Sequence, residues 1–138
     1  NTPLAKDTAK TAVKAATPYA DLPPDVQGMM PRGEAIYKAK CVVCHQADGR
    51  GVESMFPPLV NSDFFLDDRI RAVAQVLNGS KKELNVNGKT YKPKMGQQVD
   101  TKEDAIAVVN YCYNNFGNKN GSITLAEVGS VKIDPRRR

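Results

Sequence analysis

Apolar residues recur at helical spacing in the segment DDRIRAVAQVLNG, residues 67–79. The pattern i, i+3, i+4 and i+7 predicts an amphipathic helix whose buried face carries Ile70, Val73, Ala74 and Leu77. An aspartate at a helix start accepts hydrogen bonds from free backbone N–H groups, and glycine favours the conformation that ends a helix. We therefore expect Asp67 to cap this helix and Gly79 to end it.

A second amphipathic helix is predicted for DTKEDAIAVVNYCYNNFG, residues 100–117. Thr101 and Asp104 resemble a capping box, and Gly117 is placed to end the helix. One face is apolar and is expected to be buried: Ala105, Val109, Cys112 and Phe116, with Ile106 and Tyr113 beside it. Cys112 is therefore expected to be a small buried thiol, with a disulfide-linked dimer as the alternative.

Shorter patterns predict the remaining elements. PRGEAIYKAKCVVCH, residues 31–45, repeats apolar residues at helical spacing, and we expect order to begin around Pro31. Asn87 and Gly88 lie between alternating residues in LNVNGKTY, which predicts a small β-hairpin. The segment SITLAEVGSV near the C-terminus is compatible with one short helix. Three main helices, one hairpin and long irregular connections are therefore expected.

The chain has 138 residues, which is enough for one domain with one core. Residues 1–30 are rich in Ala, Thr, Lys and Pro, which predicts an N-terminal arm or linker with a short helix near residues 4–16. Residues 31–118 are the expected folded domain. Residues 119–138 are expected to be a C-terminal extension with a short helix and a basic tail of three arginines.

The net charge of +5 is unevenly distributed. Residues 33–117 hold eleven basic and ten acidic side chains, whereas residues 118–138 hold five basic and two acidic ones. No basic groove is interleaved with aromatic residues, so nucleic acid is not expected as a partner. No apolar run approaches the ~20 residues that span a bilayer, so we expect no transmembrane segment. Because the chain begins with Asn1 rather than Met, we expect a periplasmic or otherwise exported protein whose signal peptide has been removed.

The segment CVVCH, residues 41–45, brings two of the three cysteines and the single histidine of the chain within five positions. Zinc sites and iron–sulfur clusters need four ligands, and Cys112 is the only further soft ligand of this kind. A redox-active dithiol of the thioredoxin kind is expected in a βαβ context. Cys-x-x-Cys-His is the attachment signature of c-type haem, in which two thiols add to the porphyrin vinyl groups and the histidine binds iron. We therefore expect one covalent haem c on Cys41 and Cys44, with His45 as the proximal ligand; an incidental or redox-active cysteine pair is the alternative.

The second axial position decides what such an iron can do. With one histidine in the chain, methionine is the next choice of ligand. Met29 and Met30 precede the motif, and Met55 lies only ten residues beyond His45, a tight span for circling a porphyrin. Met95 lies in the irregular loop YKPKMGQQ, which is long enough to wrap the opposite face. We therefore expect Met95 to be the distal ligand, with core filling as the alternative.

Four segments together resemble a bacterial class I cytochrome c, namely CVVCH, PPL, KPKMGQQ and AIAVVNYCYNNFGN, over about residues 31–118. The resemblance implies an all-α cytochrome c fold, with three main helices around one covalent haem, a small hairpin and long loops. It also implies that the N-terminal helix crosses the C-terminal helix at a glycine and aromatic contact, with Gly33 and Tyr37 against Val109 and Tyr113. The hairpin, the NNFGN helix end and ITLAEV look like the cytochrome domains attached to, or serving, copper nitrite reductases and quinoprotein dehydrogenases.

Carried over residue by residue, the resemblance implies a complete haem site. Cys41 and Cys44 correspond to the thioether residues, and His45 and Met95 correspond to the two axial iron ligands. The proline whose carbonyl orients the proximal histidine corresponds to Pro58 in FPPLV.

The expected function is electron transfer between redox proteins by one low-spin haem c. No histidine, serine or thiol is available as a paired acid, base or nucleophile, so an electron carrier rather than an enzyme is expected. Five lysines against one glutamate in residues 81–94 predict a positive patch facing an acidic docking surface on a reductase, oxidase or dehydrogenase. The alternatives are a haem sensor or enzyme in which Met95 dissociates for a small ligand, and a tethered electron-transfer domain of a larger reductase or dehydrogenase.

Overall fold

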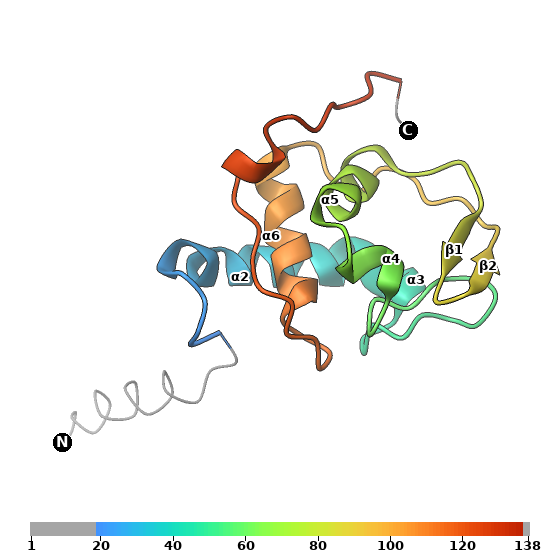
Figure 1. Ribbon diagram of the computed structural model, residues 1–138, viewed down its shortest axis with the longest axis horizontal. Helices are drawn as coiled ribbons and strands as arrows, with labels where there is room; N and C mark the ends of the chain where they lie inside the picture. The colour runs from blue at the N-terminus through green and yellow to red at the C-terminus, as the bar shows by residue number, and fades with distance from the viewer. Residues whose placement is uncertain (1–18, 137–138) are drawn as a thin grey trace.

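One continuous helical stretch carries the CVVCH segment in the computed structural model, which describes residues 19–136 (Figure 1). It consists of α2 (Pro24–Ile36), a π-helical turn η1 (Tyr37–Cys41) and α3 (Val42–His45). A proline suits the first position of α2, because a helix leaves that N–H without a partner. The predicted helix near residues 4–16, and residues 137–138 of the arginine tail, lie outside the described residues.

The expectation that order begins around Pro31 is wrong, because α2 already starts at Pro24. Pro31 lies inside the helix, where it removes one backbone hydrogen bond. Val26 and Met30 of the same helix are 0% and 3% exposed, so the packing of this face outweighs that cost. Helix α2 therefore continues across residue 30, the predicted boundary between arm and domain. The division of the chain into arm, domain and extension stays a prediction.

The π-helical turn η1 widens the helix just before the CVVCH segment. In such a turn a backbone N–H bonds to the carbonyl five residues back, and here the N–H of Val42 bonds to the carbonyl of Tyr37. The inserted residue shifts the helical register, so that Cys41 and His45 follow on a buried face. Gln46, with a φ of 71°, ends the helix. Turns of this kind frequently occur at functional sites.

Helix α6 (Lys102–Tyr113) crosses α2 with the two backbones in contact at Gly33 (Figure 1). A Cβ atom at Gly33 would lie 2.2 Å from the Ala107 carbonyl oxygen and 2.7 Å from the Cβ of Tyr111. The ring of Tyr37 packs beside that of Tyr111, with the two centroids 5.9 Å apart. The prediction of a glycine and aromatic contact between these helices is therefore confirmed.

The predicted partners on α6, Val109 and Tyr113, are wrong for this contact, since Ala107 and Tyr111 make it. Residues two positions apart lie on nearly opposite sides of a helix, so the two pairs cannot share one face. Val109 lines a pocket on the other side of α6. Tyr113 packs edge-on against Phe65, with 4.9 Å between ring centroids, and its hydroxyl donates a hydrogen bond of 2.7 Å to the Phe65 carbonyl.

Two helices, α4 (Asp63–Leu66) and α5 (Arg69–Asn78), lie on the pocket side of α6. The side chains of Ser62 and Asp68 cap them by accepting hydrogen bonds from backbone N–H groups. The cap of α5 is therefore Asp68 and not the predicted Asp67. The predicted end of α5 at Gly79 is confirmed.

The buried face of α5 differs in part from the prediction. Val73 and Leu77 are buried as expected, but Ile70 is 41% exposed. The buried stripe instead continues through Ala72 and Val76. Sequence periodicity is compatible with either neighbouring stripe, and tertiary packing selects between them.

The predicted β-hairpin is confirmed and consists of β1 (Leu84–Val86) and β2 (Lys89–Tyr91). Val86 pairs with Lys89, and the two residues between them, Asn87 and Gly88, have positive φ angles of 53° and 82°. Two positive φ angles are typical of the type I′ turn that joins short antiparallel strands.

The C-terminal part of the chain packs on α6 and includes the expected short helix, η2 (Ala126–Val128). The fully buried amide of Asn110 donates to the Ile123 carbonyl at 3.0 Å and accepts from the Ile123 N–H at 2.7 Å. Ile123 and Val128 are themselves 0% exposed, so this segment contributes to the core. Within residues 19–136, no helix has the length and apolar character needed to cross a membrane.

Replacing Gly33 with alanine should destabilise the fold, because the added methyl group would overlap the backbone of α6. Overpacking of this kind lowers the free energy of unfolding by about 1–3 kcal/mol. Gly28 is a matched control, since it is exposed in the same helix and a Cβ there would meet nothing within 4 Å. Gly28→Ala should stabilise the helix by about 0.5–1 kcal/mol. Denaturant titration of both variants checks the prediction, and equal stabilities would show that the crossing is not tight.

Candidate functional site

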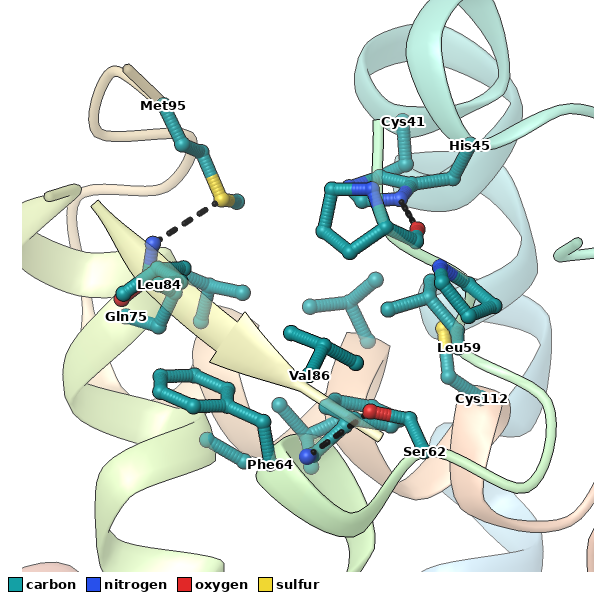
Figure 2. Close-up of a pocket in the computed structure, with 17 residues that line it drawn as sticks. Cys41, His45, Leu59, Ser62, Phe64, Gln75, Leu84, Val86, Met95 and Cys112 are labelled. Carbon is teal, nitrogen blue, oxygen red and sulfur yellow. Dashed lines mark hydrogen bonds between the residues drawn. The ribbon is translucent and has the colours of Figure 1, made fainter. Parts of the chain in front are cut away.

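A largely apolar pocket of about 590 Å³, including the space at its mouth, lies between α3, α5, α6 and the hairpin (Figure 2). Most of the wall consists of aliphatic, aromatic and proline side chains: Pro57, Pro58, Leu59, Phe64, Phe65, Ala72, Val76, Leu84, Val86, Val108 and Val109. A few polar or sulfur-containing groups complete it: Cys41, His45, Ser62, Gln75, Met95 and Cys112.

The His45 imidazole is oriented by a hydrogen bond of 2.9 Å from Nδ1 to the Pro57 carbonyl oxygen. A carbonyl oxygen can only accept, so the proton is on Nδ1 and Nε2 keeps its lone pair. Burial lowers the pKa of His45, while the hydrogen bond to Pro57 acts in the opposite direction. The lowered pKa favours the neutral ring at neutral pH, which is the form that binds metal ions.

Pro58 was the expected acceptor for His45, and this expectation is wrong because Pro57 accepts the hydrogen bond. Pro57 has no regular secondary structure and precedes another proline, which restricts it to extended conformations, and neighbouring carbonyls of an extended chain face different ways, so only one of the two meets the ring. A hydrogen bond of 2.6 Å from the Leu59 N–H to the Gly49 carbonyl fixes which one does. Pro58 still lines the pocket, so its side chain remains part of the site.

Met95 lies across the pocket from His45, and its side chain extends into the space between them (Figure 2). Its sulfur accepts a hydrogen bond from the Gln75 amide, with 3.3 Å between Nε2 and Sδ. Its backbone forms an antiparallel bridge with Ser80, with N···O distances of 2.8 and 3.0 Å. Both the backbone and the side chain of Met95 are therefore held from the C-terminal end of α5.

Gly79 allows this close approach of the Met95 loop to the end of α5. Its φ is +74°, and a Cβ atom there would lie 2.5 Å from the Met95 carbonyl oxygen. A side chain at this position would therefore push the loop away from the helix, in addition to the strain of the positive φ.

The three cysteines occupy different positions around the pocket. Cys41 lines it and is 7% exposed, and burial together with the nearby Cys44 thiol raises the pKa of Cys41 to about 11. Cys44 is half-buried and is not among the lining residues. Cys112 lines the pocket from α6 and is 3% exposed, which confirms the prediction of a buried thiol. Burial raises the pKa of Cys112 well above its ordinary value.

This arrangement suits a flat, metal-containing group bound from both faces. A neutral imidazole nitrogen and a thioether sulfur are good ligands for a transition metal of intermediate softness. The apolar walls suit a large aromatic ring, and Cys41 lies beside His45 at the edge of the pocket. Within the described part of the chain, no three His, Cys, Asp or Glu side chains gather to hold a metal ion by themselves.

Gln75 is, besides Pro57, a polar contact of the site that the sequence prediction missed. It lies on α5 between Ala72 and Val76, which are both buried and line the same pocket. Gln75 comes three residues after Ala72 and directly before Val76, and a polar residue beside two buried apolar residues one helical turn apart is a sequence signal for a polar group directed into a core. The prediction places the buried face of this helix on Ile70 and Ala74, and Gln75 does not lie on that face.

Residues 30–114, more than half of the chain, match the family model described as Cytochrome c. The matched range contains Cys41, Cys44, His45 and Met95. Among curated proteins, the cytochrome c subunit of alcohol dehydrogenase (quinone) from Gluconobacter oxydans (strain 621H) is 38% identical over 45 residues. The aligned stretch is 33% of this chain and 9% of that subunit, so the chain spans a small part of its relative's length.

The Cys112 thiol should react with iodoacetamide only when the protein unfolds. Its buried position excludes the reagent, and its raised pKa keeps it protonated at neutral pH, whereas the thiolate is the reactive form. Alkylation in native buffer should be at least about a hundredfold slower than in denaturant, because it requires an opening of the fold that costs several kcal/mol. Peptide mass spectrometry gives both rates. Labelling at similar rates, or a disulfide-linked dimer on a non-reducing gel, would contradict this assignment.

Proposed function

The chain belongs to the cytochrome c family, whose members carry iron in covalent haem c and transfer electrons, and on that premise we propose which residues form the haem site. Cys41 and Cys44 would attach the haem covalently, and His45 and Met95 would bind its iron. The observation that carries this proposal is the placement of His45 and Met95 on opposite sides of one apolar pocket, with Cys41 lining it (Figure 2).

Each of these residues has a role that follows from its surroundings. The Pro57 carbonyl fixes the His45 ring and leaves Nε2 free to bind iron. The Met95 thioether would bind the iron in both oxidation states, so little would have to rearrange when an electron moves. Bound haem supplies the one-electron couple, and a thioether opposite an imidazole raises its potential relative to a bis-histidine site. The apolar walls keep water away and so tune the same couple.

The protein is an electron carrier by family, and we further propose that it exchanges electrons with an acidic surface of a redox protein. The lysines of residues 81–94 are all exposed: Lys81, Lys82, Lys89, Lys92 and Lys94. Lys89 is paired with Glu53 at 3.2 Å, which reduces its contribution. The same segment contributes Leu84 and Val86 to the pocket wall, so this positive patch borders the proposed haem site.

The class of the redox partner is also a proposal. The relative named above is a subunit of a quinone-dependent alcohol dehydrogenase, which supports a dehydrogenase as the partner or as the larger protein to which this domain is attached. A reductase or an oxidase is compatible with the same site. A periplasmic or otherwise exported location stays a prediction.

Replacing Met95 with alanine should leave the haem attached but open the iron to carbon monoxide. The cysteines that hold the haem are untouched, whereas one axial position loses its protein ligand. Met55→Ala is the matched control, because Met55 is 50% exposed and does not line the pocket. Spectrophotometric titration of the reduced proteins measures the effect. Ready and complete carbon monoxide binding by the unmodified protein would favour a ligand sensor over an electron carrier.

The rate of electron transfer to the anionic oxidant ferricyanide should fall as ionic strength rises, because the lysine patch attracts the reagent. The double variant Lys82→Glu, Lys92→Glu should lower the low-salt rate several-fold and flatten its salt dependence. Lys119→Glu makes one such charge change at an exposed residue outside this segment, after the end of α6, and should change the rate much less. Stopped-flow measurements supply the rates. A rate independent of salt would rule out the patch.

A further inference from the structure

We propose that Gln75 is a positioning residue for the distal ligand and that its amide raises the reduction potential of the haem iron. This inference rests on the proposed function, since it requires the Met95 sulfur to bind iron. It adds a role for a residue on α5 that lies outside both the CVVCH segment and the Met95 loop.

The contact that carries the inference is the hydrogen bond from Gln75 Nε2 to Met95 Sδ, at 3.3 Å (Figure 2). Sulfur is a weak hydrogen-bond acceptor, so the stability that this bond adds to the fold does not by itself explain why an amide faces a thioether in an apolar pocket. Most of the surrounding wall offers no other polar partner to this amide, and the contact is partly buried. The amide is therefore directed at the sulfur by its position on the helix.

The position of Gln75 on α5 makes this contact specific. One turn further along, the same helix ends at Gly79, and Ser80 forms the backbone bridge to Met95. The helix therefore fixes the backbone of Met95 at one point and its sulfur at another. With both held, the thioether has little freedom to rotate, and the sulfur lone pair not used by Gln75 is the one left for the iron.

The same hydrogen bond changes the strength of the sulfur ligand. An N–H group that points at the sulfur withdraws electron density from it, so the thioether donates less to the iron. Ferric iron needs that donation more than ferrous iron does, so the hydrogen bond favours the reduced state. Hydrogen bonds next to the axial ligand are a known means by which proteins adjust haem potentials.

Two substitutions separate the donor role of Gln75 from space filling. Gln75→Leu removes the donor and keeps most of the volume, whereas Gln75→Ala removes both. If the donor matters, both variants lower the equilibrium constant for reduction by about threefold, which corresponds to about 30 mV for a one-electron couple. They should also shift or weaken the iron–thioether charge-transfer absorption of the oxidised protein.

Gln98→Leu is the matched control, because Gln98 lies in the Met95 loop but its amide donates to the Gly96 carbonyl, at 2.9 Å, and not to sulfur. Its potential and absorption should equal those of the unmodified protein. Unchanged values in Gln75→Leu, or a change that grows with the volume removed, would overturn the inference while leaving Met95 as the ligand. Absence of the iron–thioether absorption in the unmodified protein would overturn the inference and the proposed ligand together.

Discussion

The contact of α2 with α6 at Gly33 is the constraint on which the rest of the structure depends. Because the Ala107 carbonyl lies directly against Gly33, the distance between the two helices and the point at which they cross are both fixed. The helical stretch that continues from α2 then ends in His45, while the opposite side of α6 presents Val109 and Cys112. Tight packing at a position far from the chemistry therefore fixes two walls of the pocket that is proposed to hold the haem.

The two proposed axial ligands come from separate parts of this framework. His45 belongs to the rigid helical stretch and is oriented by Pro57, whereas Met95 belongs to a loop that depends on α5 for its position. Helix α5 in turn packs on α6. An electron carrier needs a coordination geometry that stays the same in both oxidation states, and ligands held on opposite sides by connected helices meet that need.

Several local features of this protein could be predicted from its sequence, whereas most of the residues that meet between distant segments could not. The α6 cap at Thr101, the turn at Asn87 and the end of α5 at Gly79 depend on neighbouring residues alone, and they are confirmed. Whether His45 donates its hydrogen bond to Pro57 or to Pro58 depends on how a long loop returns to the histidine, and no local sequence pattern predicts that path. The same holds for the face of α6 that meets Gly33 and for the direction of Gln75.

Iron-edge X-ray absorption of the purified protein, in the oxidised and the reduced state, tests the proposed site most directly. The proposed site predicts one sulfur ligand and five nitrogen ligands around the iron in both states, with little change in the iron–ligand distances between the two states. In this proposal the sulfur would be that of Met95, and the nitrogens would be those of the porphyrin and His45. An iron with no sulfur ligand, or one that loses a ligand on reduction, would contradict the assignment of His45 and Met95 as a fixed axial pair.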